Sequence, residues 1–89
     1  DKRPAAESIL AELGLDWSQA AAMGDDWPDL PMLRRAALAC VPLSGHPEAL
    51  ALAHHVTSAL PGSGAVRELC DLLLVASGAY ADLLEEAAR

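Results

Sequence analysis

The sequence predicts an α/β fold, in which a parallel sheet of short strands carries helices on both faces. Two observations support the prediction. Apolar runs alternate along the chain with segments of helical periodicity, in the order α-β-α-β-α-β-α. The runs are short, as is typical of a parallel sheet that is covered by helices. Because ligands of such sheets bind beyond the carboxyl ends of the strands, the residues after each run are the first candidates for a site.

The first helix and the first strand are recognised by the residues at their ends. Pro4 suits the first turn of a helix, where its missing N–H costs nothing, and Gly14 is placed to end that helix. Leu10 and Leu13 recur between them at helical spacing. The alanine-rich run that follows is ambiguous, since alanine favours helix. Its shortness and its flanking turn residues favour a strand over Ala20–Met23.

The middle of the chain continues the alternation. A short helix is expected over Asp29–Arg35, and a strand over Leu38–Leu43. Ser44 is placed to cap a helix that has Pro47 in its first turn and runs through "PEALALAHH". The segment "HVTS" then predicts the third strand.

The last part of the chain begins with a turn, "LPGSG". The segment "AVRELCDLLLVASG" is the clearest helix of the sequence, and Gly78 marks its end. An amphipathic piece, Tyr80–Arg89, closes the chain. Residues 1–89 are therefore interpreted as one small domain or a portion of one.

The composition of the chain argues against some classes of binding partner. Six basic and 13 acidic residues give a net charge of −7, which argues against nucleic acid or an anionic membrane as partner. No apolar run approaches the roughly 20 residues that span a bilayer. Apolar residues make up 53% of the sequence, a high share for so short a chain. Some of them are expected to face a partner, another subunit or a missing part of the same domain.

Cysteines and tryptophans add two smaller expectations. Cys40 and Cys70 have no CxxC spacing, so both are predicted to be buried thiols in a reducing compartment, which favours the cytoplasm. Trp17 and Trp27 are interpreted as packing residues. The chain starts "DKRPAAES" and opens directly on helix signals, as if it belonged to something longer.

An acidic cluster follows the first predicted strand. In "GDDWPD", Asp25, Asp26 and Asp29 lie within five positions and repel one another unless a cation neutralises them. Hard cations such as Mg²⁺ take a few carboxylates and keep waters for a phosphate substrate. The structural alternative is that Asp25 and Asp26 cap the helix that follows.

Other candidates are weaker when taken alone. His46 also follows a predicted strand. Gly62 and Gly64 precede a helix and could present backbone N–H groups to an anion, although such a turn, taken alone, is more often a plain connection. Arg67, one turn into that helix, could hold a phosphate or pair with a neighbour such as Glu68.

Taken together, these segments resemble one family. The order "DK", "MGDDWPDLPML", "GHPEAL", "HVT" and "PGSGAVRELCDLLLVASG" is similar to the 3-deoxy-D-manno-octulosonate 8-phosphate phosphatases, a capless branch of the haloacid dehalogenase-like superfamily. The resemblance runs over roughly residues 1 to 78. It implies that the chain is the second, C-terminal half of a Rossmann-like domain.

The resemblance also implies roles for individual residues. Lys2 resembles the lysine that neutralises the nucleophile and the substrate phosphate. Asp25 resembles the Mg²⁺ ligand, and Asp26 and Asp29 complete or orient its coordination. The implied substrate-binding residues are His46, Gly62, Gly64 and Arg67, the last three near an entrance to which a neighbouring subunit contributes. The implied assembly is a homotetramer.

Three departures from the family pattern concern substrate recognition. The family's paired glycines are replaced here by Pro61-Gly62, and its Ala-His-Pro element by Gly45-His46-Pro47. The aspartate that is common two residues before this histidine is replaced by Ser44. A fourth departure concerns catalysis. The family's nucleophile is an aspartate of a "DxDG" motif, and the chain contains no "DxD".

The function expected of the parent protein is Mg²⁺-dependent hydrolysis of a sugar-acid phosphate, 3-deoxy-D-manno-octulosonate 8-phosphate, through an aspartyl-phosphate. It would serve lipopolysaccharide biosynthesis in the cytoplasm. The 89-residue chain alone is expected to be inactive. Two alternatives stay open: another substrate such as a nonulosonate 9-phosphate, including in a domain fused to a sugar-nucleotide synthetase, and a non-catalytic assembly module of the same fold.

Overall fold

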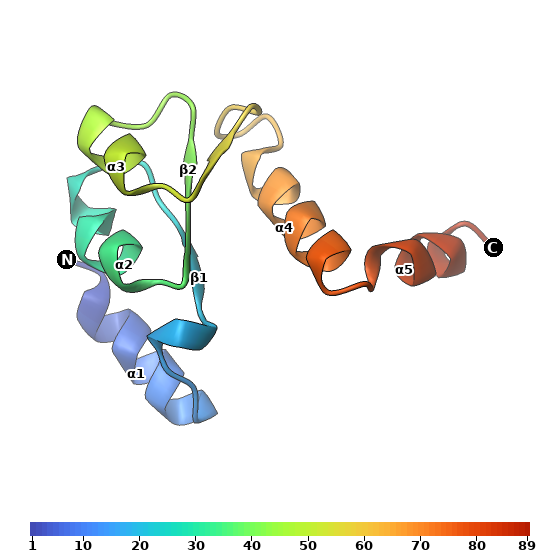
Figure 1. Ribbon diagram of the computed structural model, residues 1–89, viewed down its shortest axis with the longest axis horizontal. Helices are drawn as coiled ribbons and strands as arrows, with labels where there is room; N and C mark the ends of the chain where they lie inside the picture. Colours follow the sequence, from blue (N-terminus) through green and yellow to red (C-terminus); the bar gives the residue numbers. More distant parts are fainter.

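The computed structural model describes residues 1–89 and has a three-stranded parallel sheet at its centre (Figure 1). The strands follow the order β1-β2-β3, and Cys40 of the middle strand lies opposite Met23 on one side and His55 on the other. This arrangement confirms the predicted parallel sheet. The strands are β1 (Ala21–Met23), β2 (Leu38–Pro42) and β3 (His55–Thr57).

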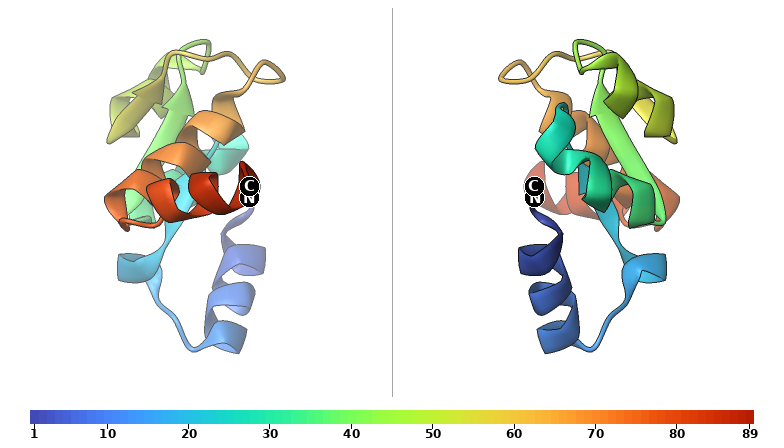
Figure 2. Two further views of the ribbon diagram at one scale, coloured as in Figure 1. Left: turned by 90° about the vertical axis from the view of Figure 1, so that its right-hand side faces the viewer. Right: turned by 90° about the vertical axis from the view of Figure 1, so that its left-hand side faces the viewer.

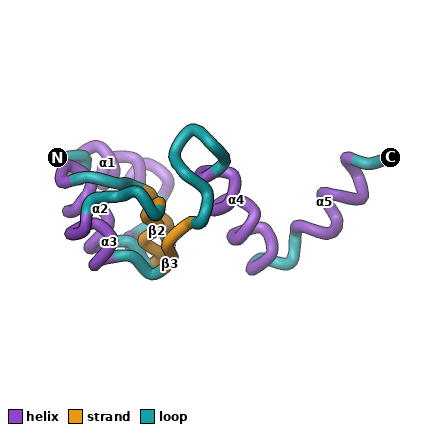
Figure 3. The backbone as a smooth tube through the Cα atoms, turned by 90° about the horizontal axis from the view of Figure 1, so that it is seen from above, coloured by secondary structure: helices purple, strands orange, loops and turns teal.

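Helices cover both faces of the sheet, as predicted. Seen from above (Figure 3), α1, α2 and α3 lie on one side of the strands and α4 lies on the other. In Figures 1 and 3, α5 extends beyond α4, away from the strands, and Figure 2 shows the molecule from the right-hand and left-hand sides of Figure 1. The helices are α1 (Arg3–Leu13), α2 (Leu30–Arg35), α3 (Pro47–Leu52), α4 (Ala65–Ala76) and α5 (Tyr80–Ala87). None of them is both long enough and apolar enough to cross a bilayer.

Two short 3₁₀ helices were not expected from the sequence. They are η1 (Trp17–Gln19) and η2 (Trp27–Asp29), and each is preceded by an aspartate whose side chain accepts a backbone N–H of the first turn. These capping aspartates are Asp16 and Asp26. Asp29, which was expected to open a helix, therefore ends η2, and α2 begins one residue later.

The predicted third helix is too long by three residues. It ends at Leu52, because Ala53 is extended and His54 pairs with the middle strand. The backbone N–H of His54 donates to the carbonyl of Ala39 at 2.8 Å, and the N–H of Ala39 donates to Nδ1 of His54, also at 2.8 Å. This pairing satisfies a backbone donor of β2 that a longer helix would leave without a partner.

The other element ends differ from prediction by one to three residues. Ala20, Leu43 and Ser58 lie outside the strands that were expected to include them. The last two helices stop at Ala76 and Ala87, before the expected ends. Helix and strand ends commonly shift by this amount, since the terminal backbone groups can pair with turns instead.

The core is small and built from small side chains. Only 12 of the 89 residues are buried, and Leu33 and Val41 are the largest apolar side chains among those almost wholly excluded from solvent. Trp17 packs against this core, as expected. The core cluster consists of Ala22, Leu33, Ala36, Ala39, Val41 and Ala49.

Two predicted packing residues are instead exposed. Cys40 is buried in β2, but Cys70 is exposed on α4, whose buried residues are Ala65 and Leu69. Trp27 keeps 59% of its surface exposed. Large apolar side chains such as Ile9, Leu13 and Val75 are also exposed, so the predicted excess of apolar surface is present in the structure.

Leu33 should anchor the layer between α2 and the sheet. Leu33→Ala is expected to lower the free energy of unfolding of the full-length protein by about 2–5 kcal/mol. Leu33 is only 1% exposed, so its truncation leaves a cavity in the core. Leu33→Met, which conserves volume, should cost less than about 1.5 kcal/mol. Urea denaturation of the three proteins measures both values, and equal losses for the two variants would contradict this role.

Candidate active site

The loops that follow the three strands meet at one end of the sheet. The N–H of Gly24 donates to the carbonyl of Cys40 at 3.2 Å, and the N–H of His46 donates to the carbonyl of Asp25 at 2.8 Å. Across the other strand pair, the N–H of Leu43 donates to the carbonyl of Thr57 at 3.2 Å. The carboxyl ends of β1, β2 and β3 therefore form one connected surface, where such sheets place ligands.

Asp29 is the buried charge of this surface. Its side chain is 4% exposed, and its Oδ1 lies 2.7 Å from Nζ of Lys2. Its Oδ2 accepts the backbone N–H groups of Asp25 at 2.9 Å and of Asp26 at 3.3 Å. One carboxylate thus fixes Lys2, from the start of α1, against the loop that carries the other two acids.

Gly24 makes room for this arrangement. A Cβ atom at that position would lie 2.4 Å from Cβ of Asp29, a distance that side chains do not tolerate. The glycine that ends the apolar run is therefore required by the close approach of Asp29, and not by a positive φ angle.

The Lys2–Asp29 pair stays ionised at neutral pH. Burial opposes the charge on Asp29, but the hydrogen bond from Lys2 and those from the backbone of Asp25 and Asp26 outweigh it and hold the pKa of the carboxyl below its usual value. The hydrogen bond to Asp29 and its charge raise the pKa of Lys2. Lys2 is still 63% exposed, so its ammonium group remains available to an anion.

The remaining two acids have different environments. Asp26 caps η2, since its Oδ1 accepts the N–H of Trp27 at 2.7 Å, which is the structural alternative considered for this residue. The carboxylate of Asp25 has no hydrogen bond or ion pair within the chain. Asp25 is therefore the acid of the cluster whose oxygens remain free.

Asp25 lines a pocket of about 190 Å³ at the ends of β1 and β2. The pocket brings Asp25 together with Gly62, two of the predicted site residues that lie far apart in the sequence. Gly64 is the N-cap of α4 and does not line the pocket. The lining residues are Met23, Gly24, Asp25, Pro42, Pro61, Gly62, Ala65 and Val66.

Arg67 lies outside this pocket. Its side chain is 72% exposed, and Nη1 is 3.6 Å from Oδ1 of Asp71, one turn further along α4. Arg67 instead borders a groove between α4 and α5, together with Tyr80. Within one chain the structure does not bring Arg67 to Asp25.

Glu68, considered in the sequence analysis only as an ion-pair partner of Arg67, belongs to the site region, and Arg67 pairs with Asp71 instead. The carboxylate of Glu68 accepts the backbone N–H of Ser58 and of Ala59, each at 3.1 Å, and lies 2.9 Å from Nε2 of His55. These bonds lower the pKa of Glu68 to about 2, the hydrogen bond with His55 being the largest cause. Glu68 thereby fixes the start of the loop that carries Gly62 and Gly64. The sequence does contain one signal for this role of Glu68, since an acid stands in the first turn of a helix that follows a glycine-rich loop.

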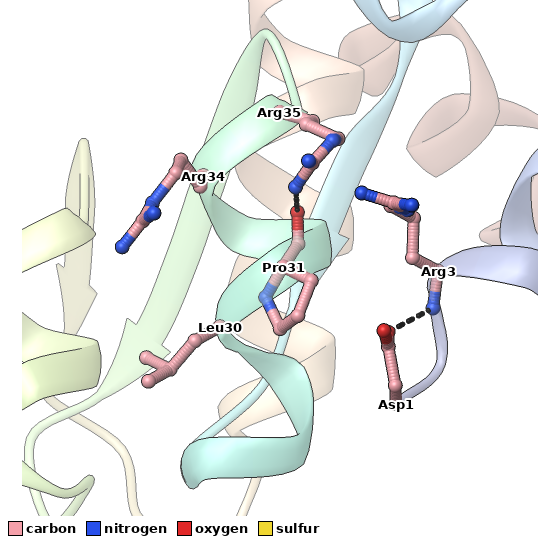
Figure 4. Close-up of a pocket in the computed structure, with 6 residues that line it drawn as sticks. All are labelled: Asp1, Arg3, Leu30, Pro31, Arg34 and Arg35. Carbon is pink, nitrogen blue, oxygen red and sulfur yellow. Dashed lines mark hydrogen bonds between the residues drawn. The ribbon is translucent and has the colours of Figure 1, made fainter.

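A second pocket lies between the start of α1 and α2 (Figure 4) and contains none of the predicted site residues. Its basic groups are used locally. Nη1 of Arg35 donates to the carbonyl of Pro31 at 2.7 Å, and Nε of Arg3 lies 3.4 Å from Glu7. Figure 4 shows Arg34 directed away from Arg35. The lining residues are Asp1, Arg3, Leu30, Pro31, Arg34 and Arg35.

The family model for haloacid dehalogenase-like hydrolases matches residues 1–69. The chain therefore belongs to the haloacid dehalogenase-like hydrolase family. Among curated relatives, it is similar to the 3-deoxy-D-manno-octulosonate 8-phosphate phosphatases of Yersinia pestis, at 42% identity over 85% of the chain, and of Escherichia coli K12, at 37% identity over 88%. The chain spans 41% and 42% of the lengths of these relatives.

Solved structures confirm the fold. A probable phosphatase from Pseudomonas syringae superposes with a TM-score of 0.94 at 37% identity, over all of this chain and 51% of its own. The 3-deoxy-D-manno-octulosonate 8-phosphate phosphatase of Moraxella catarrhalis, solved with a magnesium ion, phosphate and a KDO molecule, superposes with a TM-score of 0.93 at 32% identity, over 97% of this chain and 49% of its own. The α/β prediction and the family resemblance are thus confirmed.

Glu68 should make the fold sensitive to acid. Because its folded-state pKa, about 2, lies below its ordinary value of 4.5, the ionised form stabilises the fold above pH 4.5, and this contribution is lost as the pH falls toward 2. Glu68→Gln should therefore reduce stability at neutral pH and flatten its decline between these values.

Urea unfolding of the full-length protein at a series of pH values measures this effect. Glu12→Gln, an exposed glutamate on α1, is the matched control. A Glu68→Gln profile parallel to that of the control would show that the bonds of Glu68 do not stabilise the folded state.

Proposed function

We propose that the protein to which these 89 residues belong is a Mg²⁺-dependent phosphatase that hydrolyses 3-deoxy-D-manno-octulosonate 8-phosphate. The observation that carries this proposal is the 42% identity to a curated phosphatase of that substrate, over a segment that includes the Asp25 site. The chain covers less than half of that relative, so the proposal concerns the whole protein.

The residues of this chain fit a magnesium site in part. Mg²⁺ keeps several waters and uses one or two carboxylates together with substrate phosphate oxygens. The free carboxylate of Asp25, at the rim of a pocket, suits such a ligand, and Asp26 lies next to it. No three acidic, histidine or cysteine side chains of the chain are close enough to hold an ion by themselves. The remaining ligands would come from the other part of the protein and from the substrate.

Asp29 suits an orienting role better than direct ligation. Both of its oxygens are already occupied, one by Lys2 and the other by the backbone of Asp25 and Asp26. The ammonium group of Lys2, protonated and partly exposed, would neutralise the charge of the substrate phosphate. A bound Mg²⁺ would polarise the same phosphoryl group.

The nucleophile would lie outside these residues. The family resemblance implies an aspartate in a "DxDG" motif and an aspartyl-phosphate, and this chain contains no "DxD". We therefore expect residues 1–89 alone to be inactive. His46 and Gly62 would contact the sugar acid from the same end of the sheet. Gly64 and Arg67 would act at an entrance shared with a neighbouring subunit of a cytoplasmic homotetramer.

The metal assignment is tested in the full-length protein. Asp25→Asn should lower Mg²⁺-dependent turnover by about 100-fold or more, since even outer-shell changes at metal sites cost 10–100-fold. Asp16→Asn is the matched control, since it makes the same change at an aspartate at the opposite end of β1. Asp16 caps η1 as Asp26 caps η2. Chelation should abolish turnover of the wild type, and Mg²⁺ should restore it. Unchanged turnover of Asp25→Asn would remove Asp25 from the site.

The substrate assignment needs a panel of phosphate esters. The value of kcat/KM for 3-deoxy-D-manno-octulosonate 8-phosphate should exceed that for a nonulosonate 9-phosphate and for p-nitrophenyl phosphate by about tenfold or more. A preference for the nonulosonate ester would favour the alternative substrate. The absence of turnover with every ester would favour an assembly module of the same fold.

A further inference from the structure

Trp27 is unusually exposed for its size, yet its one polar group is paired. Trp27, the first residue of η2, keeps 59% of its surface exposed. Its indole Nε1–H donates to Nδ1 of His46 at 3.3 Å. The two rings meet edge to face, with centroids 5.5 Å apart and planes at 74°. The aromatic contact joins the loop after β1 to the loop after β2.

His46 is held by three separate contacts. Its backbone N–H donates to the carbonyl of Asp25 at 2.8 Å, which fixes the residue beside the candidate metal ligand. Its Nδ1 accepts the backbone N–H of Glu48 at 3.2 Å in addition to the indole of Trp27. His46 is also the N-cap of α3, so its backbone is fixed by the start of that helix.

These contacts determine which ring nitrogen of the neutral His46 carries the proton. A neutral imidazole has one donor and one acceptor nitrogen. Because the lone pair of Nδ1 accepts two N–H groups, Nδ1 itself carries no hydrogen. The proton of the neutral ring therefore lies on Nε2. Nε2 has no partner within the chain, and it is not among the buried polar atoms that lack one. His46, whose backbone N–H bonds to Asp25, therefore presents a single side-chain donor, Nε2–H, to solvent.

We propose that Trp27 is a positioning residue that holds His46 with its Nε2–H directed to the substrate. The group that would meet this donor is an oxygen acceptor, a carboxylate or hydroxyl of a sugar acid, and this part of the inference rests on the proposed function. Trp27 acts through His46 by fixing its ring and its tautomer. It lies one residue from Asp26, so the same loop carries the acidic cluster and this device.

Nitrogen NMR tests the tautomer without any activity. In uniformly ¹⁵N-labelled full-length protein, at a pH where imidazoles are neutral, Nδ1 of His46 should resonate as an unprotonated nitrogen and Nε2 as a protonated one. His46→Gln identifies the signals. Trp27→Phe keeps an aromatic ring but removes one of the two donors to Nδ1, and with only the N–H of Glu48 left it should shift both signals part of the way toward a mixture of tautomers. A wild-type proton on Nδ1, or unchanged signals in Trp27→Phe, would overturn the proposal.

The only other tryptophan provides the control. Trp17 packs against the core and lies in η1, before β1, at the end of the strand away from the site. Trp17→Phe should leave the His46 signals unchanged. A shift of the same size in Trp17→Phe would mean that the signals report general loosening, which would overturn the specific role of Trp27.

Kinetics test the contact with the substrate. Trp27→Phe should raise KM for 3-deoxy-D-manno-octulosonate 8-phosphate by about 3- to 10-fold, the effect of weakening one hydrogen bond, while kcat changes less than KM. An unchanged KM, with the tautomer altered, would overturn the contact between Nε2 and the sugar acid. A wild-type protein that hydrolyses none of the esters would overturn the proposed function and this contact together, and the NMR result would still decide the role of Trp27.

Discussion

A carboxylate that leaves water must find its hydrogen bonds inside the protein, and Asp29 finds them in the groups that the candidate site needs. Its oxygens accept from the backbone of Asp25 and Asp26 and pair with Lys2, which comes from the start of another helix. Gly24 provides the space. One buried carboxylate thus holds the loop after β1 and Lys2 together, and the carboxylate of Asp25 is the one left free.

The loop after β3 uses the same physical device. Glu68 reaches back from the first turn of α4 and accepts the N–H groups of Ser58 and Ala59, while His55 pairs with it from the strand itself. An ionised acid thus fixes each of the outer loops, and the loop after β2 is tied to Asp25 through the backbone of His46. The buried carboxylate of Asp29 and the hydrogen-bonded carboxylate of Glu68 stabilise the geometry, whereas the unpaired carboxylate of Asp25 and the exposed side of the Lys2 ammonium group are available for chemistry.

Away from the candidate site, much of the apolar surface of the molecule stays uncovered. Its core consists largely of alanines, and β1 has an unpaired edge with the exposed apolar side chains of α1 beside it. A small buried core contributes a modest free energy of folding. The chain spans about two fifths of its curated relatives, and the apolar excess seen in its composition corresponds to surface that this chain does not cover by itself.

The sequence by itself determined the alternation of short strands and helices and the parallel sheet, because apolar periodicity and end residues are local signals. It also determined the family, through motifs such as "GDDWPD". Only the tertiary structure decided which of the three neighbouring aspartates is buried, which caps a turn and which stays free. It alone decided that His54 ends α3 by pairing with Ala39, and that Trp27 meets His46. These outcomes depend on donors that converge from distant segments, and no local spacing encodes such convergence.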